Sequence, residues 1–423
     1  MKRLMIVLVL LLLVPLMACD QQTAAELLMS DKPRETSPDV SEADLALLVE
    51  GNSAFAFELY QALKEKDGNL FYSPHSISVA LAMTYAGARG NTAEEMAATL
   101  HFLLEQDRLH PAFNWLDAEL ASRGEGAQGK DGEGFRLNIV NAIWGQKDYE
   151  FLTTFLDVLA ENYGAGLRIL DFITETEASR LAINQWVSDQ TNERIPELIP
   201  QGAIDALTRL VLTNAIYFNA AWEYPFNGNI TSEGPFYLLD GGQVPVPMMK
   251  QTESFGYTEG EGYQAVELLY DGDELSMVIL LPASGNFEAF EEGLQAEDVS
   301  DIISDLQPAE VALTMPKFEF DSDFSLKDTL TAMGMPIAFS GAADFSGMTG
   351  GLDLCISEVL HKAFVSVDEA GTEAAAATAV IMRETAMPDQ PVEVTIDRPF
   401  IFLIRDIETS AILFVGRVLN PGS

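Results

Sequence analysis

The chain has 423 residues, of which 48% are hydrophobic and 21% charged, as is typical of a globular protein with a substantial core. Its formal net charge is −41, from 65 acidic against 24 basic residues. This charge argues against nucleic acid and anionic lipid surfaces as partners, because both attract proteins through clustered Lys and Arg.

The N-terminus has the pattern of a secretory signal. Lys2 and Arg3 precede an apolar run that ends at Ala18. This run is shorter than the roughly 20 residues that a membrane-spanning helix needs. We therefore expect residues 1–18 to be a signal peptide that is removed from the mature protein.

The end of the signal resembles the lipobox of bacterial lipoproteins, with the sequence Leu-Met-Ala-Cys at residues 16–19. Cys19 would then be the lipidated first residue of the mature chain. The alternative is an ordinary signal peptide followed by an incidental cysteine. The expected location is extracytoplasmic, either lipid-anchored at the cell envelope or secreted, and the lipid is the only contact with a membrane that we predict.

Residues 19–43 are rich in Gln, Thr, Ser, Asp and Pro, and this composition predicts a flexible tether. An amphipathic helical pattern begins at Asp44. A second apolar helix is predicted over residues 76–87, and Asn91 is predicted to be the N-cap of a third.

Strand patterns dominate the later part of the chain. They are apolar runs over residues 137–144, 210–218, 275–281, 400–405 and 411–418. Helices first, and then helices mixed with many strands, favour an α+β fold with large sheets. Because neither an internal repeat nor a linker appears after residue 45, we expect one large domain over residues 44–423.

Motifs for catalysis and cofactors are missing from the sequence. The four histidines lie outside known zinc spacings, and no cysteine pair, phosphate-binding loop or nucleophile elbow occurs. Ser73 and His75 are close in sequence and raise the possibility of a hydrolase. Since sequence adjacency rarely gives the geometry of a nucleophile and its base, buried polar groups are the better interpretation. We expect no metal, no cofactor and no enzymatic activity.

The segment EAGTEAAAATAV, residues 369–380, is ambiguous. Alanine favours a helix, but this helix would lack an apolar stripe to attach it to a core. The preceding residues 363–368 alternate as a half-buried strand does.

Several segments together resemble the serpin family over almost the whole chain from Asp44 to Asn420. In order they are Asn69–Ile77, Leu212–Phe218 with Trp222, Pro247–Lys250, Met315–Phe318, His361–Ala363, Val367–Thr378, Asp397–Phe400 and Phe414–Val418. Each segment is weak evidence alone, and their order and spacing make the resemblance specific.

The resemblance implies one domain of three β-sheets and eight or nine helices, with an exposed reactive-centre loop near the C-terminus. It also implies a monomer that inhibits a serine protease as a suicide substrate. The protease cleaves the loop and forms an acyl-enzyme ester, and the loop then inserts into the central sheet as a new strand. The target would be elastase-like or subtilisin-like, with a trypsin-like enzyme or a cysteine protease as alternatives.

The inserting hinge is the segment from Glu369 to Thr378. In alternate positions it carries small uncharged side chains, which suit a packed sheet because a buried unpaired charge is costly. These are Thr372, Ala374, Ala376 and Thr378, whereas Glu373, Ala375 and Ala377 have the opposite register. Gly371 would allow the chain to turn. This intact hinge favours inhibition over a non-inhibitory binding or chaperone-like role.

Two supporting clusters are implied by the resemblance. The shutter, beneath the centre of the sheet, would consist of Ser73, Ser76, Asn214 and His361. The breach, where the loop enters, would consist of a Lys317–Glu369 ion pair with Trp222 nearby.

The scissile bond is predicted after Thr385, giving Thr385-Ala386, if the count is made from the hinge. A count back from Pro399 falls instead near Pro388-Asp389. Arg383, which would suit a trypsin-like enzyme, and Met387 are the further alternatives. Insertion would then use residues 371–385.

Overall fold

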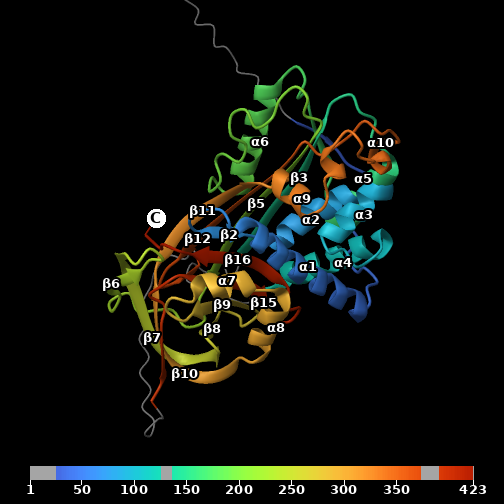
Figure 1. Ribbon diagram of the computed structural model, residues 1–423. Helices are drawn as coiled ribbons and strands as arrows, with labels where there is room; N and C mark the ends of the chain where they lie inside the picture. Colours follow the sequence, from blue (N-terminus) through green and yellow to red (C-terminus); the bar gives the residue numbers. More distant parts are fainter. Residues whose placement is uncertain (1–24, 125–135, 373–389, 423) are drawn as a thin grey trace, which may run out of the picture.

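A seven-stranded sheet forms the long axis of the protein. The computed structural model describes residues 25–124, 136–372 and 390–422 (Figure 1). This sheet, sheet A, runs in the order β1 (Glu26–Leu28), β4 (Leu167–Leu170), β3 (Arg136–Gln146), β5 (Leu210–Ala221), β13 (Gly371–Thr372), β12 (Glu358–Val367) and β11 (Phe318–Ser325).

The other strands are connected by hydrogen bonds into a second sheet. Its order is β14 (Val392–Thr395), β10 (Gln307–Pro316), β7 (Gln243–Gly260), β8 (Tyr263–Leu269), β9 (Leu275–Pro282), β15 (Phe400–Asp406), β16 (Ile412–Val418) and β2 (Leu70–Tyr72), with β6 (Ser232–Tyr237) also on β7. Residues 243–248 of β7 pair with β6, residues 248–257 pair with β10, and residues 256–260 pair with β8. By hydrogen bonding the described strands thus form two sheets, of seven and nine strands, where three sheets were expected.

The described residues form ten α-helices and one short 3₁₀ turn, against eight or nine helices expected. They are α1 (Glu42–Leu63), α2 (Pro74–Tyr85), α3 (Gly90–Thr99), α4 (Gln106–Ser122), α5 (Thr153–Tyr163), α6 (Thr176–Gln190), α7 (Phe287–Gly293), α8 (Ala296–Ser304), α9 (Lys327–Met333), α10 (Ser346–Thr349) and the 3₁₀ turn Ile337–Phe339. Three of these helices have seven residues or fewer, so the number depends on how single turns are counted. No helix in the described ranges is long and apolar enough to cross a membrane.

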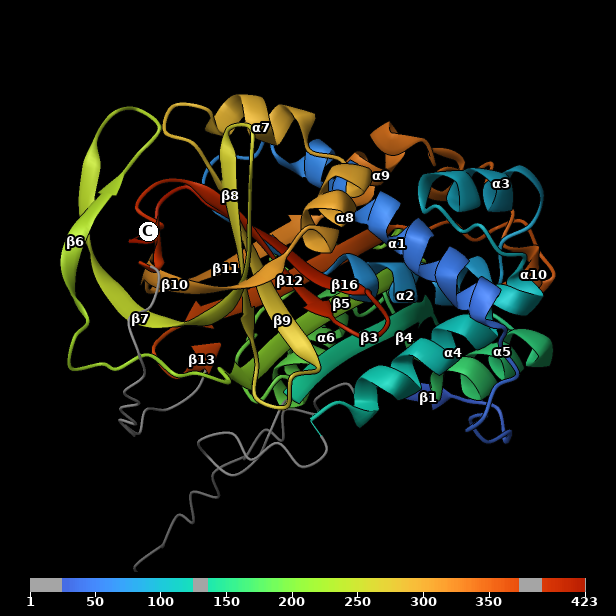
Figure 2. The same cartoon turned by 90° about the horizontal axis from the view of Figure 1, so that it is seen from below.

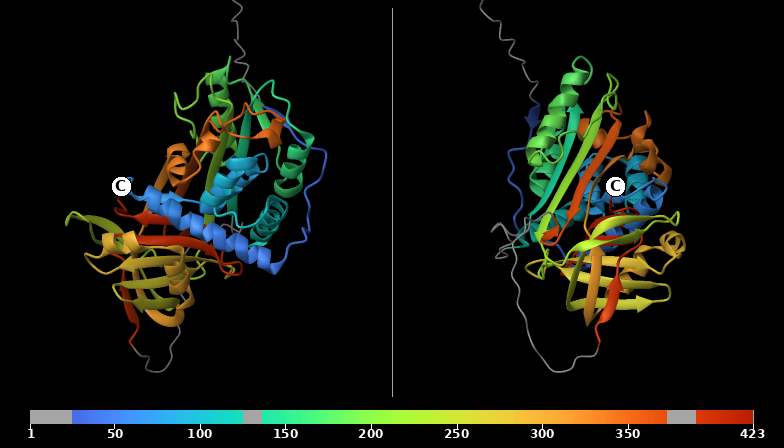
Figure 3. Two further views of the ribbon diagram at one scale, coloured as in Figure 1. Left: turned by 45° about the vertical axis from the view of Figure 1, so that its right-hand side comes forward. Right: turned by 90° about the vertical axis from the view of Figure 1, so that its left-hand side faces the viewer.

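Sheet A is covered on both faces. Successive side chains of β5 point to opposite faces of the sheet. On one face, Val211 and Ala215 belong to a hydrophobic cluster that includes Ile183 and Val187 of α6. Leu212 and the other side chains of the opposite register join the main core, which α1, α2 and the second sheet share. Figure 3 shows the green helix α6 on one side of the strands and the blue helices on the other. A strand that enters this sheet must therefore fit between two packed layers.

The prediction of a flexible tether over residues 19–43 is wrong for its described part. Residues 26–28 form β1, which pairs with β4 at the edge of sheet A. Arg34 Nε donates to Asn114 Oδ1 at 2.7 Å, and α1 begins at Glu42, with the Ser41 hydroxyl accepting the Asp44 N–H. The polar composition suggested solvation, but these side chains have partners on the body. Residues 19–24 lie outside the described residues.

The predicted N-cap at Asn91 is also wrong. Helix α3 begins one residue earlier, at Gly90, and Arg89 is its N-cap residue. The Thr92 hydroxyl, which resembled part of a capping pattern, instead accepts the N–H of Asp344. The Thr92 side chain therefore makes a hydrogen bond to a distant loop and does not cap its own helix.

Candidate functional site at the centre and the open end of sheet A

One row of polar residues crosses the middle of sheet A. The strand register aligns Asn141 of β3 with Asn214 of β5, and Asn214 with His361 of β12. Asn214 Nδ2 donates to Asn141 Oδ1, and His361 Nδ1 contacts Asn214 Oδ1. This row is continuous across the boundary between β5 and β12, where a new strand would have to enter.

His361 in this row is held in one neutral tautomer. The backbone N–H of Ser73 donates to His361 Nε2 at 3.3 Å, so Nδ1 carries the proton that is donated to Asn214. The His361 side chain is fully buried, and burial lowers its pKa to about 3. The imidazole is therefore uncharged at neutral pH.

Helix α2 supplies the remaining members of the shutter from below the sheet. The Ser73 hydroxyl caps this helix by accepting the Ser76 N–H at 3.1 Å, and Pro74 occupies its first turn. The Ser76 hydroxyl accepts a hydrogen bond from Asn214 Nδ2 at 2.5 Å. The structure thus brings together all four residues predicted for the shutter, Ser73, Ser76, Asn214 and His361.

The hydrolase alternative finds no support in this geometry. Ser73 Oγ is occupied as a helix cap, and neither ring nitrogen of His75 has a hydrogen-bond partner among the described residues. His75 is instead a buried side chain that packs near Phe113, and burial lowers its pKa to about 4.

The breach lies at the C-terminal end of β5, beside the turn that connects β12 to β13. Lys317 Nζ and Glu369 Oε2 are 2.6 Å apart, and the Thr231 hydroxyl donates to Glu369 Oε1 at 2.8 Å. Burial alone would raise the pKa of Glu369, but these two donors bring it below its ordinary value. The carboxylate is therefore held charged in the turn that leads into the hinge.

Trp222, which directly follows β5, contacts the same turn. Its backbone N–H donates to the Ala370 carbonyl at 2.9 Å, and its indole Nε1–H donates to the Asp368 carbonyl at 3.0 Å. The ring stacks on Tyr270 with the centroids 4.7 Å apart. The three predicted breach residues thus surround one turn, although the indole bonds to its backbone rather than to the ion pair.

The first two residues of the hinge strand already lie inside sheet A. Gly371 and Thr372 pair with Ala221 and Ala220 of β5, and Thr372 also pairs with Val367 of β12. The Thr372 side chain is fully buried, and its hydroxyl is 2.8 Å from that of Tyr270.

Glycine is required at position 371 by contact as well as by its φ of 158°. A Cβ there would lie 2.1 Å from the carbonyl oxygen of Ala220 and 2.6 Å from Cα of Ala221. Both atoms belong to the backbone of β5 and cannot move without disturbing the sheet.

The other predicted hinge and loop residues lie outside the described residues. They are Glu373, Ala374, Ala375, Ala376, Ala377, Thr378, the scissile pair Thr385 and Ala386, and the alternatives Arg383 and Met387.

Sequence reasoning missed four residues of the site. Three of them make hydrogen bonds to site residues, namely Asn141, Thr231 and Tyr270. The fourth, Asp368, holds the turn, since its Oδ1 accepts the Ala370 N–H at 2.7 Å. Asn141 had a visible signal, a polar residue within an apolar strand. Thr231 and Tyr270 contact the site only through the tertiary fold, whereas Asp368 adjoins Glu369 in the segment that resembles serpins.

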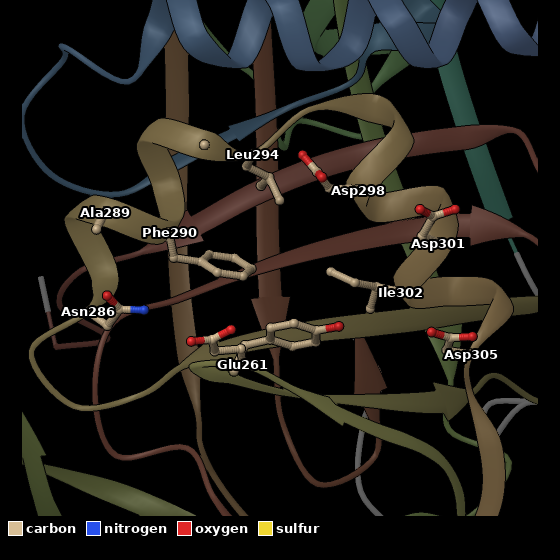
Figure 4. A pocket seen from close by; sticks show the side chains of 11 residues that line it. Glu261, Asn286, Ala289, Phe290, Leu294, Asp298, Asp301, Ile302 and Asp305 are labelled. Carbon is tan, nitrogen blue, oxygen red and sulfur yellow. The ribbon is translucent and has the colours of Figure 1, made fainter.

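One cavity lies away from this site. It measures about 440 Å³ and is lined by α7, α8 and the β7–β8 hairpin (Figure 4). Figure 4 shows Phe290 on one side of this cavity and Asp298, Asp301 and Asp305 along the rim on the other side. These carboxylates are exposed to solvent, so the rim is a solvated acidic surface. In the described ranges no group of three or more His, Cys, Asp or Glu residues could hold a metal ion.

Comparisons with known proteins agree with this geometry. A family model described as Serpin (serine protease inhibitor) matches residues 50–421. An uncharacterized serpin-like protein of Thermococcus kodakarensis is 42% identical over 377 residues, which cover 88% of this chain and 86% of the relative. The leukocyte elastase inhibitor of Xenopus laevis is also 42% identical over 377 residues, covering 87% and 97%.

Solved structures lead to the same family. The native state of tengpin, a thermophilic serpin, superposes with a TM-score of 0.82 at 28% identity and covers 94% of this chain and all of that one. Uncleaved ovalbumin superposes with a TM-score of 0.79 at 26% identity, covering 88% of this chain and all of ovalbumin. The family is one of protease inhibitors and not of enzymes. The chain therefore belongs to the serpin family.

Proposed function

We propose that this protein inhibits secreted serine proteases as a suicide substrate. The protease serine hydroxyl attacks the carbonyl carbon of Thr385, the peptide bond to Ala386 breaks, and the amine of Ala386 leaves with a proton. The protease remains bound through an ester to Thr385. Residues 373–385 then follow Gly371 and Thr372 into sheet A and carry the protease to the far end of the sheet.

The observation that carries this proposal is β13, because its two residues occupy the first positions of the strand that would be inserted. The register with β5 and the register with β12 are independent, and both can be extended down the sheet. Extended along β5, the register would bring Thr378 opposite Asn214, and extended along β12 it would bring Thr378 opposite His361. Both partners belong to the polar row at the centre of the sheet. The insertion would break the contact between these two side chains, and the hydroxyl of Thr378 could replace it.

The composition of the loop supports the same strand. Residues on the face of Thr372 are Ala374, Ala376 and Thr378, which are small and uncharged. The environment on this face is seen at Thr372, whose side chain is fully buried and contacts Tyr270. A charge here would be buried without a partner, at a cost of several kcal/mol.

The length of β5 bears on the scissile bond. Extension of the register places residue 382 opposite Leu210, the first residue of β5. A cut after Thr385 therefore supplies a strand that spans the sheet and a short linker to the protease. A small residue before the bond suits elastase-like and subtilisin-like enzymes, and two relatives are named leukocyte elastase inhibitors.

The test is incubation with elastase, subtilisin and trypsin, followed by denaturing electrophoresis and mass spectrometry of the released C-terminal fragment. We expect a covalent complex that survives boiling in detergent, and a fragment that begins at Ala386. A fragment beginning at Glu384 or Pro388 would move the bond to Arg383 or Met387. Clean cleavage by all three enzymes without a complex would refute inhibition and favour a non-inhibitory binding or chaperone-like role.

A matched pair of variants tests insertion within the same assay. Thr372→Arg places a guanidinium on the buried face and should convert the inhibitor into a substrate, reducing the complex by more than about tenfold because a buried charge costs several kcal/mol. Glu373→Arg places the same group in the opposite register and should retain inhibition. Equal inhibition by both variants would contradict insertion in this register.

We also propose that the protein acts outside the cytoplasm, attached through a lipid on Cys19. The support is the signal-like run that ends in Leu16-Met17-Ala18-Cys19. Metabolic labelling with radioactive palmitate in a bacterial host should label the wild-type protein and not Cys19→Ala. Labelling that persists in Cys19→Ala would refute this site of attachment.

A further inference from the structure

The N-terminal segment from Glu26 to Glu35, which we term the docked segment, is attached to the body along its length. β1 pairs with β4 through three residues at the outer edge of sheet A. A Cβ on Gly166 would lie 2.5 Å from the Leu28 carbonyl oxygen, so the two backbones approach closely here. The pairing fixes the position at which the preceding chain leaves the domain.

Polar contacts continue this attachment across two helices. Lys32 Nζ lies 3.3 Å from Asp157 and 2.8 Å from Glu161, both on α5. Arg34 binds Asn114 and Asp117 of α4, at 2.7 and 2.5 Å. The Ser30 hydroxyl donates to Asp157 at 2.5 Å. These contacts bridge separate elements, so the segment has one position on the body.

The chain leaves the domain at the end of sheet A that is remote from the hinge. The registers align Glu26 with Ile169, Ile169 with Gly145, and Gly145 with Leu210 at the start of β5. Thr372 is opposite Ala220, ten residues further along the same strand. At about 3.3 Å per residue, the exit and the hinge are about 33 Å apart along the sheet. Figure 2 shows β1 and β13 well separated in this way.

We propose that the docked segment orients the protein on its membrane, with the hinge end of sheet A directed away from the lipid. The inference rests on the proposed lipid at Cys19. Only six peptide units then join the anchor to Ala25, and they span at most about 20 Å. The exit end of sheet A therefore stays next to the lipid, and the hinge end is the far end.

A free tether would give no such orientation. A flexible chain over residues 19–43 would have a root-mean-square length of roughly 27 Å and a much greater maximum reach. The body could then turn with either end towards the lipid. The docked segment removes this freedom, so a protease from the medium meets the loop and not the membrane.

The experiment measures energy transfer from a dye on the protein to the lipid surface. The full-length lipidated protein, with Cys355→Ser to remove the other thiol, is bound to phosphatidylcholine vesicles that contain rhodamine-labelled phosphatidylethanolamine. A donor dye is attached in turn through Leu207→Cys, an exposed position near the exit, and Gln390→Cys, an exposed position beside the loop. We expect transfer from position 207 to exceed that from position 390 at least about twofold, given the 33 Å between the two ends.

Release of the docked segment should abolish this difference. Lys32→Glu with Arg34→Glu replaces both cations that face carboxylates on α5 and α4. Lys147→Glu with Lys250→Glu makes the same charge change outside the segment and should preserve the difference. Equal transfer from both dyes in the vesicle-bound wild-type protein would overturn the orientation while leaving the anchor intact. Failure of the protein to bind the vesicles would refute the anchor, and the orientation with it.

Discussion

His361 links the strands that must separate for a loop to enter sheet A. Both of its ring nitrogens are used, one by the Ser73 backbone and one by the Asn214 side chain. A protonated ring would need to donate from both nitrogens, and Ser73 N–H cannot accept. The row is therefore stable only with a neutral imidazole, which is the state that its burial enforces.

The free energy of unfolding should consequently depend on pH through His361. Its folded pKa of about 3 lies below the ordinary value of 6.5, so the unfolded state binds the proton more readily between these values. The stabilisation is complete above pH 6.5 and is lost as the pH falls towards 3, at roughly 1 kcal/mol per pH unit. Urea unfolding of wild type and His361→Gln at several pH values measures it. Acidification should destabilise the wild-type protein more than His361→Gln, so the difference in their free energies of unfolding should narrow. A difference that stays constant with pH would contradict stabilisation by the neutral His361 ring.

Gly371 should be needed to keep the hinge strand in the sheet, because a Cβ there collides with the backbone of Ala220. Gly371→Ala should expel β13 and remove the contact of Thr372 with Tyr270, on which Trp222 stacks. The expected result is a shift of tryptophan fluorescence towards longer wavelength. Gly228→Ala, whose Cβ would meet Glu369 at an ordinary 3.8 Å, is the control. An unchanged spectrum for Gly371→Ala would show that the strand is held in another way.

The residues of the site were predictable from sequence only where they carry a pattern. His361, Asn214 and Lys317 were found through the resemblance to serpins, and the structure places them in contact with the expected partners. Tyr270 was not found, because it lies in a strand-to-strand connection and reaches Thr372 only after both sheets have formed. Such contacts depend on distant parts of the chain.

The docked segment is the element whose structure differs most from the prediction. Short polar stretches with Ser, Asp and Pro suggest a linker on composition. What composition omits is the unpaired edge of β4, whose backbone groups offer hydrogen bonds to any adjacent strand. By contrast, β9 was predicted to within one residue, and β5 was predicted from its first residue but three residues too short, since a long apolar run can be satisfied only inside a core.

Removal of one contact in this segment should be measurable as a loss of stability. Arg34→Ala leaves the buried Asn114 side chain without one of its partners, and we expect a loss of about 1–2 kcal/mol. Urea unfolding of the full chain measures it. Lys250→Ala, at an exposed position on β7, should change stability by less than about 0.5 kcal/mol. An equal effect of the two substitutions would show that residues 30–35 contribute little to the fold.

For the molecule as a whole, inhibition by loop insertion requires that sheet A can accept a further strand. β5 and β12 now pair directly with each other from Glu358 to Phe364, below the point where β13 separates them. An inserted strand would break this ladder and form hydrogen bonds with both neighbours, a net gain of about one hydrogen bond for each inserted residue. At about 1 kcal/mol for each net hydrogen bond, the gain is on the order of 10 kcal/mol.

The most direct measurement of this claim is the melting temperature of the full-length protein before and after its loop is cut by a protease. If the loop inserts, the cut protein should melt more than about 10 °C higher, because each additional kcal/mol raises the midpoint by a few degrees in a large domain. Cut Thr372→Arg protein should show no such rise. A cut wild-type protein that melts at the temperature of the intact one would contradict insertion of the loop into sheet A.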